Sequence, residues 1–363
     1  MSENIVRKNV LRLRPYVPGK PIEEVERELG ISNIIKMASN ENVLGPSPRA
    51  LKAMREELEH VALYPDGNCF QLRLAVAKHL GVEPNQLIFG NGSDDIIHMI
   101  GLTFLQEGDE CVQGDVTFSQ YEACAVLNDC GCRMAPVKDF TFDVDAMIAQ
   151  LTDKTKLIFI ANPNNPTGTM ITHDDVQRLV DKMPERCILV MDEAYYEYVD
   201  NPDYPRALEW VKQGRNVIVL RTFSKIYALA GLRVGYGVAT PELISYIERV
   251  REPFNVNSVA MVGAIASLDD PAQVERSKSL NDAGKAYLYK EFDRMGLPYS
   301  PTQANFVWVD VKKDSVKVFK DMLQKGVIIR TGDIFGASTH IRVTIGTEEQ
   351  NVRFIKALGE VLA

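Results

Sequence analysis

Seven short runs of apolar and β-branched residues recur through the middle of the chain, and they constrain its fold more than any other feature. They are residues 86–89, 110–113, 133–137, 156–161, 187–192, 217–222 and 234–239. Most are apolar at consecutive positions, which is typical of strands buried on both faces. Helical patterns separate many of these runs, so the sequence predicts an α/β fold whose sheet is covered by helices on both faces.

Two of the intervening helices are marked by polar residues at their starts. Residues 93–105 form one predicted helix, with Ser93 as its expected N-cap. Residues 173–183 form another, entered through Thr172 as the expected N-cap. These starts support the alternation of strands and helices.

The C-terminal part of the chain has a different order of elements. We expect a helix at 271–295, a strand at 305–311, a helix at 315–325, strands at 326–331 and 340–346, and a last helix from about 348. Adjacent strands with helices to one side are typical of a smaller α+β domain. The predicted divisions are an arm at 1–42 that packs at the interface of the two domains, a large domain at 43–268 and a small domain at 269–363.

Composition argues against several classes of protein. The 363 residues include 49 acidic and 41 basic side chains, a net charge of −8, which disfavours a nucleic-acid-binding protein acting through its overall field. No apolar run approaches the roughly 20 residues that cross a bilayer. The first residues lack the apolar stretch of a signal peptide, so we expect a cytoplasmic protein with no membrane partner. The cysteines and histidines lack zinc-site spacing, which predicts free thiols and no bound metal.

Four polar clusters follow predicted strands at the end where open α/β sheets bind ligands. They are Gly90–Asp94, Asn162–Gly168, Asp192–Tyr195 and Arg221–Arg233. Each alone has an ordinary structural explanation: a capped turn, a loop, a buried acid that caps a helix, and a surface loop with a lysine. Their joint occurrence at strand ends is what indicates a site.

Together the clusters suit one ligand, an aromatic aldehyde that carries a phosphate. A desolvated Lys225 can lose its proton and form a Schiff base with the aldehyde. Asp192 would pair with a pyridinium nitrogen, so that the ring can draw electrons from a substrate. Hydrogen bonds to the ring hydroxyl would come from Asn165 and Tyr195, and the phosphate would be held by Gly92, Ser93, Ser224 and Arg233.

With these clusters the sequence resembles the fold-type I pyridoxal-phosphate enzymes and, more narrowly, the histidinol-phosphate aminotransferases. The resemblance covers nearly the whole chain and extends to Pro15–Pro21, Ala38–Asn42, Leu63–Gly67 and Ile341–Thr347. It implies a large domain with a mixed, mostly parallel seven-stranded sheet, a smaller α+β domain, and pyridoxal 5'-phosphate as cofactor. The implied reaction is transamination between L-histidinol phosphate and 2-oxoglutarate in histidine biosynthesis, giving imidazole acetol phosphate and L-glutamate.

The resemblance also implies roles for individual residues. Lys225 would hold the cofactor and move the substrate proton, with Asp192 and Tyr195 as the other catalytic residues. Further cofactor contacts would come from Gly92, Ser93, Asp94, Phe118, Asn165, Ser224 and Arg233. Tyr64 would reach the cofactor phosphate of the neighbouring subunit in a homodimer. Substrate contacts would come from Tyr16, Asn40, Arg330 and Arg342.

Two departures from the family pattern remove no catalytic group. Val43 replaces the usual proline of an Asn-Glu-Asn-Pro segment, and Phe118 stands where tyrosine is common. The main alternative is an aromatic amino-acid aminotransferase on the same scaffold, and a decarboxylase of a phosphorylated amino acid also stays open. A regulatory module without turnover is disfavoured by the intact Lys225, Asp192 and Asn165 and by the absence of an appended helix-turn-helix domain.

Overall fold

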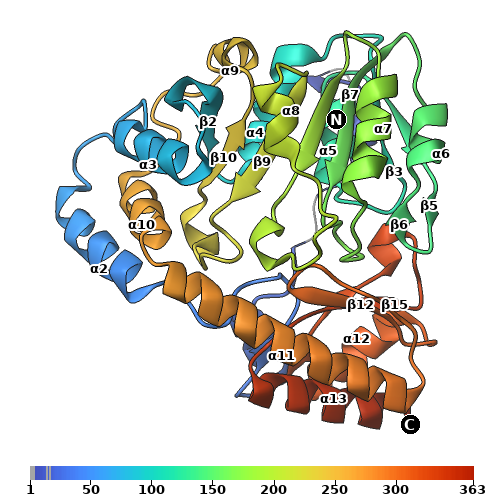
Figure 1. Cartoon of the computed structure of the whole chain (residues 1–363). Coiled ribbons are helices and arrows are strands. Elements are labelled where there is room, and N and C mark those ends of the chain that lie inside the picture. Colours follow the sequence, from blue (N-terminus) through green and yellow to red (C-terminus); the bar gives the residue numbers. More distant parts are fainter. Residues whose placement is uncertain (1–4, 14, 16–17) are drawn as a thin grey trace.

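A seven-stranded sheet forms the centre of the computed structural model, which describes residues 5–13, 15 and 18–363 (Figure 1). In spatial order its strands are β2 (Leu87–Gly90), β10 (Gly235–Val238), β9 (Val217–Thr222), β8 (Ile188–Asp192), β7 (Thr155–Ala161), β3 (Glu110–Gly114) and β4 (Gly131–Ala135). β10 is antiparallel to both neighbours, and the other adjacent pairs are parallel. These strand directions confirm the predicted mixed, mostly parallel sheet. Each predicted run also lies within about two residues of an observed strand.

Helices cover both faces of this sheet because successive strand residues point to opposite sides. In β8, Leu189 and Met191 are buried in one core, whereas Ile188 and Val190 are buried in a second. The first core includes residues of α3 (Phe70–Leu80), α6 (Val144–Ala149), α7 (His173–Lys182), α8 (Ala207–Lys212) and α10 (Ser258–Leu268). The second includes residues of α4 (Ser93–Phe104), α5 (Gln120–Leu127) and α9 (Pro241–Ile247).

The two predicted helix caps have different outcomes. Thr172 caps α7, and Asp175 completes a reciprocal capping box, so that prediction is confirmed. The prediction for Ser93 is wrong, because Ser93 is the first helical residue of α4 and Gly92 occupies the N-cap. Gly92 has φ +80°, a conformation that glycine adopts without a steric penalty. The peptide N–H groups of Ser93 and Asp94 therefore belong to the open start of the helix.

A second unit follows in the C-terminal part of the chain. Its antiparallel sheet has the order β11 (Tyr299–Ser300), β12 (Phe306–Asp310), β15 (His340–Thr344) and β14 (Arg330–Thr331). Its helices are α11 (Pro271–Met295), α12 (Ser315–Gln324) and α13 (Glu348–Leu362). Val307, Val309, Ile341 and Val343 of the sheet form one core with apolar residues of these helices.

The prediction of a single strand at 326–331 is wrong, because two short strands occupy that segment. β13 (Val327–Ile328) pairs in parallel with β1 (Ile35–Lys36), whereas β14 pairs with β15. The division follows from a partner far away in the sequence, since β1 belongs to the N-terminal part of the chain.

Several short elements are not among those predicted from the sequence. They are α1 (Ile22–Leu29), α2 (Pro48–Glu57), the hairpin of β5 (Val137–Lys138) and β6 (Thr141–Phe142), and the 3-10 turns η2 (Val10–Arg12), η3 (Leu58–His60), η4 (Pro84–Gln86), η5 (Tyr196–Tyr198), η6 (Ala230–Leu232) and η7 (Asp333–Phe335). In α1, Val25 packs against Leu323 and Ile328 of the C-terminal unit.

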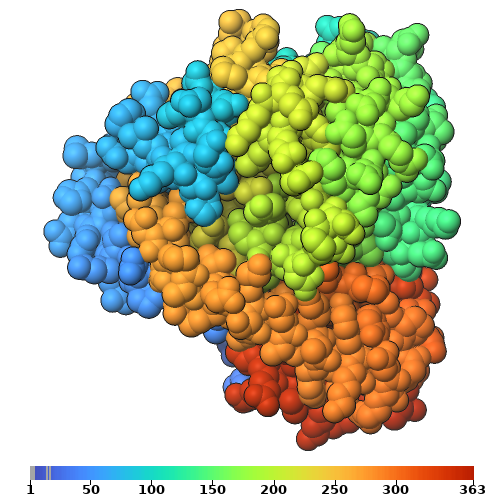
Figure 2. Space-filling model, in the orientation of Figure 1, coloured from blue at the N-terminus to red at the C-terminus, as the bar shows by residue number. Residues whose placement is uncertain are grey.

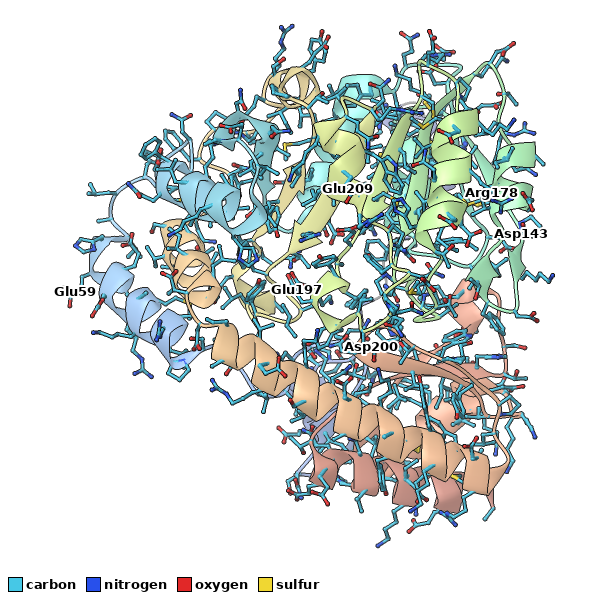
Figure 3. All side chains as sticks on the ribbon, viewed as in Figure 1. Glu59, Asp143, Arg178, Glu197, Asp200 and Glu209 are labelled. Atoms are coloured by element: carbon cyan, nitrogen blue, oxygen red, sulfur yellow. The ribbon has the colours of Figure 1, made fainter. Side chains whose placement is uncertain are left out.

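The two units lie directly against each other in the space-filling view, where the C-terminal unit is orange to red (Figure 2). Lys285 of α11 donates to Asp200 at 3.0 Å, and Ser47 donates to Asp270 at 2.7 Å. Figure 3 shows Asp200 immediately beside α11 at this junction. No described helix is both long and apolar enough to cross a membrane. All six cysteines are free thiols, as expected from their spacing.

Candidate active site

A cavity of about 250 Å³ opens where β7, β8 and β9 end. Nine residues predicted from the sequence line it, namely Ser93, Asp94, Phe118, Asn165, Asp192, Tyr195, Ser224, Lys225 and Arg233. Ser39 and Glu41 also line it; they lie in the Ala38–Asn42 segment that carries the resemblance, but they were not predicted as site residues. The structure therefore brings all four polar clusters to one hollow at the carboxyl edge of the sheet, the edge where open α/β sheets bind ligands.

Asp192 is the last residue of β8 and is 5% exposed. Its Oδ2 accepts a hydrogen bond from the Tyr121 hydroxyl at 2.7 Å, and its Oδ1 accepts one from the Ala194 N–H at 3.2 Å. Burial raises the pKa of Asp192 to about 6, while the bond from Tyr121 opposes that rise. The carboxyl group is therefore held in one orientation and is ionised at neutral pH.

Tyr121 was not predicted as a site residue, although it also lines the cavity. Its ring is fully buried and stacks on Phe159, with centroids 4.9 Å apart and planes at 5°. Phe118 meets it edge-on at 5.6 Å. Packing against these rings holds the Tyr121 hydroxyl where it donates to Asp192. In the sequence, Tyr121 has no feature that distinguishes it from an ordinary core aromatic residue.

Lys225 lies just beyond the end of β9, and its Nζ donates to the Ser39 carbonyl oxygen at 3.4 Å. The same nitrogen lies 5.6 Å from the centre of the Tyr195 ring. Burial is the main cause that lowers the pKa of Lys225 to about 8, and the charge of Arg342 lowers it further. A lowered pKa makes a neutral, nucleophilic amine accessible near neutral pH.

Anion-binding groups gather at the other end of the cavity. The first turn of α4 offers free N–H groups, and Arg233 donates to the Ser224 hydroxyl at 3.4 Å. The same guanidinium lies 3.7 Å from Asp94. A Cβ at Gly92 would lie 2.5 Å from Nη2 of Arg233, so glycine is needed for this close approach. The arrangement suits a phosphate group.

The asparagines of the Asn162–Gly168 loop have different tasks. Asn162 exchanges hydrogen bonds with the backbone of Ile171, and Asn164 donates to the Val116 carbonyl oxygen at 2.9 Å. Both are fully buried and hold the loop in place. Asn165 is the member that lines the cavity, and its Oδ1 accepts a hydrogen bond from Arg342.

Two of the predicted substrate residues, Arg342 and Asn40, form hydrogen bonds with residues that line the cavity. Arg342 of β15 also donates to the Ala38 carbonyl oxygen at 2.6 Å. Arg330 lies directly opposite Arg342 in the β14–β15 pair, so both belong to one face of that sheet. Asn40 donates to the Tyr195 hydroxyl at 2.8 Å, and burial raises the pKa of Tyr195 to about 12.

Six predicted residues are not among those that line this cavity, namely Tyr16, Asn40, Tyr64, Gly92, Arg330 and Arg342. Tyr64 is 83% exposed, stacks on Phe254 at 4.9 Å and lines a different surface hollow. Tyr16 lies outside the described residues.

The residues present fit an aromatic aldehyde phosphate part by part. Phosphate donors lie at the start of α4, a carboxylate for a cationic ring nitrogen ends β8, Phe118 offers a ring face, and Lys225 offers an amine.

Comparison with known proteins places the chain among aminotransferases. Residues 32–358 match the family model for aminotransferase class I and II. The chain is 53% identical to histidinol-phosphate aminotransferase of Moorella thermoacetica, over 98% of this chain and 93% of that one. It is 48% identical to histidinol-phosphate aminotransferase of Caldicellulosiruptor saccharolyticus, over 98% and 99% of the two chains. The crystal structure of histidinol-phosphate aminotransferase from Sinorhizobium meliloti in complex with pyridoxal-5'-phosphate matches with a TM-score of 0.92, at 26% identity over 99% and 98% of the two chains.

Proposed function

This chain belongs to the aminotransferase class I and II family, and we propose that it transfers the amino group of L-histidinol phosphate to 2-oxoglutarate. The products are imidazole acetol phosphate and L-glutamate, a step of histidine biosynthesis. The observation that carries this proposal is identity of 53% and 48%, over nearly the full length, to two histidinol-phosphate aminotransferases. These relatives do not favour the aromatic amino-acid alternative.

The cofactor of this family, pyridoxal 5'-phosphate, finds a partner for each of its parts in the cavity. Arg233, Ser224 and the first turn of α4 would hold its phosphate, and Phe118 would stack on its ring. Asp192 would face the ring nitrogen, and Lys225 would hold the aldehyde. Asn165 and Tyr195 would contact the ring hydroxyl.

When bound, the cofactor supplies an electron sink that makes the α-hydrogen of the amino donor acidic. Lys225 would take that proton and return it, since its lowered pKa suits both tasks near neutral pH. Asp192, anionic above about pH 6, would keep the ring nitrogen protonated. Because Asn40 already donates to the Tyr195 oxygen, the phenol hydrogen of Tyr195 is left to donate to a bound ligand.

We assign the recognition of two different substrates to the arginines of the C-terminal unit. Arg342 would bind the carboxylate of glutamate or 2-oxoglutarate with its planar guanidinium. Arg330 would bind the phosphate of L-histidinol phosphate, and Asn40 and Tyr16 would line the same pocket. Arg330 and Arg342 lie directly opposite each other in the β14–β15 pair. This position supports the assignment, because a substrate bound there could contact either guanidinium group.

We also propose that the active unit is a homodimer. Exposed apolar side chains gather in and near the α2–α3 connection, where Leu63 is 75% exposed, Tyr64 83%, Phe70 55% and the stacked partner Phe254 46%. Contiguous exposed apolar surface is typical of an interaction site. In such a dimer, Tyr64 would reach the cofactor phosphate of the partner, which accounts for its distance from the cavity of its own chain.

The same proposal treats residues 43–268 and 269–363 as two domains and residues 1–42 as an arm that contacts both. In support, Asn9 donates to the Leu127 carbonyl oxygen of the large unit at 2.7 Å, while Val25 packs against Leu323 of the C-terminal unit. We place the enzyme in the cytoplasm, with small molecules as its substrates.

A donor comparison tests the proposed reaction. The purified enzyme, loaded with pyridoxal 5'-phosphate, is assayed with 2-oxoglutarate and either L-histidinol phosphate, L-histidinol, L-phenylalanine or L-tyrosine. We expect the highest kcat/KM with L-histidinol phosphate and a marked loss with L-histidinol, which lacks only the phosphate. Equal or better turnover of the aromatic amino acids would contradict the proposal, and carbon dioxide release from a phosphorylated amino acid would favour a decarboxylase.

A further inference from the structure

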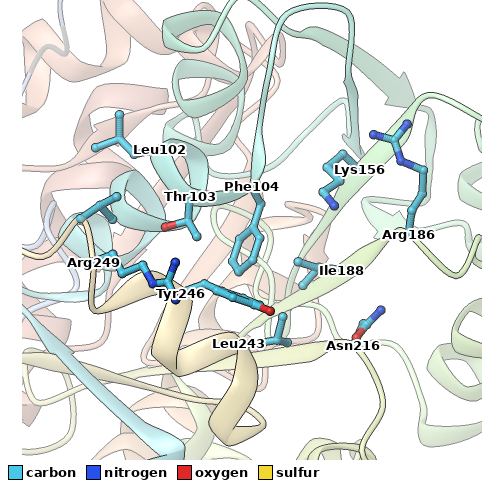
Figure 4. Close-up of a pocket in the computed structure, with 11 residues that line it drawn as sticks. Leu102, Thr103, Phe104, Lys156, Arg186, Ile188, Asn216, Leu243, Tyr246 and Arg249 are labelled. Atoms are coloured by element: carbon cyan, nitrogen blue, oxygen red, sulfur yellow. The ribbon is translucent and has the colours of Figure 1, made fainter.

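A second cavity, of about 440 Å³, lies at the opposite edge of the large sheet from the candidate active site (Figure 4). Lys156 and Ile188 lie near the starts of β7 and β8, and Asn216 directly precedes β9. The far ends of these three strands reach the active-site cavity, and in the described part of the chain no residue lines both hollows. The volume is within the range of small-molecule sites.

The floor of this amino-edge cavity is apolar and partly aromatic. Ile188 is 2% exposed and Leu243 is 8% exposed, so both belong to the packed layer between the sheet and α9. Phe104, at the end of α4, and Tyr246, on α9, present their rings to the hollow in Figure 4. This floor offers flat contacts to a planar, apolar ligand.

The rim of the same cavity is cationic. Lys156, Arg186 and Arg249 line it, and no acidic residue among those that the structure describes does so. Arg186 is paired with Asp109, whereas Lys156 and Arg249 form no ion pair with any residue in the described part of the chain. Such a rim contrasts with the net charge of −8 of the whole chain, and it favours an anion.

We propose that the amino-edge cavity binds a small aromatic carboxylate. The ring would lie on Phe104, Ile188 and Leu243, and the carboxylate would meet Lys156 or Arg249. In Figure 4 these two cations lie on opposite sides of the Phe104 ring, and both line the same hollow. A bare phosphate would leave the apolar floor unused, and a neutral aromatic molecule would leave Lys156 and Arg249 without an anionic partner, although Arg249 lies over the Tyr246 ring at 5.4 Å.

A pair of matched probes tests the two parts of this site. Fluorine NMR follows the binding of para-trifluoromethylbenzoate and of its neutral counterpart, para-trifluoromethylbenzyl alcohol, to the cofactor-loaded enzyme. Since a charge-assisted hydrogen bond to one cation is lost with the alcohol, we expect about tenfold tighter binding of the benzoate. Equal binding of the two probes, or no saturable binding of the benzoate, would refute the proposal.

Variants locate the bound probe. We expect Lys156→Gln combined with Arg249→Gln to weaken benzoate binding about tenfold and to leave transamination intact. The control is Lys212→Gln combined with Arg27→Gln, which makes the same charge change at exposed positions that line neither cavity. The variant Arg342→Gln reports on binding in the active site.

Three outcomes would overturn the assignment. Loss of benzoate binding in Arg342→Gln would place the probe in the active site. An equal loss in the control pair would make the effect one of net charge alone. A changed oligomeric state in Lys156→Gln with Arg249→Gln, at unchanged benzoate affinity, would make the cavity a contact between copies of this chain. Because the probes report binding, none of these results depends on which amino donor the enzyme prefers.

Discussion

Replacing Tyr121 by phenylalanine removes one hydroxyl from the cavity and keeps the ring. That hydroxyl donates to Oδ2 of Asp192 at 2.7 Å, whereas the stacking on Phe159 at 4.9 Å involves only the ring. The change therefore tests a single hydrogen bond to a buried carboxylate rather than the packing of α5.

The expected size of the effect follows from that bond. A hydrogen bond to a charged group contributes about 1.5–3 kcal/mol, and one pKa unit corresponds to about 1.4 kcal/mol. Loss of the bond should raise the pKa of Asp192 from about 6 by about one to two units. A carboxyl group is neutral below its pKa, so the neutral form would extend to higher pH. The variant should then bind the cofactor weakly at neutral pH, because a protonated ring nitrogen needs an anionic partner.

The assay is an absorbance titration of the apoprotein with pyridoxal 5'-phosphate at half-unit pH steps across the neutral range. We expect the midpoint of affinity loss to lie about one to two pH units higher in Tyr121→Phe than in the wild type. The control, Tyr289→Phe, loses a hydroxyl that accepts the Thr302 N–H at 2.6 Å but does not line the cavity. An unshifted midpoint, or an equal loss of affinity at every pH, would refute this account of Tyr121.

Three further predictions concern the proposed roles of Lys225, Arg330 and Tyr64. Lys225→Ala should still bind cofactor but lack the absorbance of a covalent link, and transamination should fall by about 10²–10⁴-fold; wild-type activity would contradict its role. Arg330→Ala should lower kcat/KM for L-histidinol phosphate about tenfold more than for glutamate, if a charge-assisted phosphate contact is lost; equal losses would remove its selective role. Mixing Tyr64→Phe with Lys225→Ala, provided each alone is nearly inactive, should restore part of the activity through mixed dimers; no recovery in a mixture shown to exchange subunits would count against a shared site.

The central sheet could be predicted from the sequence because its strands are buried on both sides. Residues 187–192 are apolar at nearly every position, and the structure buries all of β8 between two helical layers. The identity of the cap of α4 could not be predicted in the same way. Ser93 is a good N-cap by type, but Gly92 with its positive φ is the N-cap, so the helix starts at Ser93, one residue earlier than that choice implies.

Long-range pairing limits what a local pattern can predict. Residues 326–331 read as one strand, yet β1 pairs with its first part and β15 with its last part. Composition likewise does not separate Asn165 from Asn162 and Asn164. Their tasks differ only because Ile171 and Val116 happen to accept the other two amides in the folded chain.

The amine of Lys225 depends on the docking of the two units as well as on its own strand. Burial raises the pKa of Asp192 to about 6 and lowers that of Lys225 to about 8. Above about pH 8, Asp192 is charged and the amine of Lys225 is mostly neutral. The charged carboxylate can pair with a cationic ring nitrogen, and the neutral amine can attack an aldehyde. Part of the lowering at Lys225 comes from Arg342, which β15 of the C-terminal unit brings to the cavity. The C-terminal unit therefore contributes to the lowered pKa of Lys225 in addition to its proposed role in substrate binding, and separating it from the large sheet would return the amine toward its ordinary protonated state.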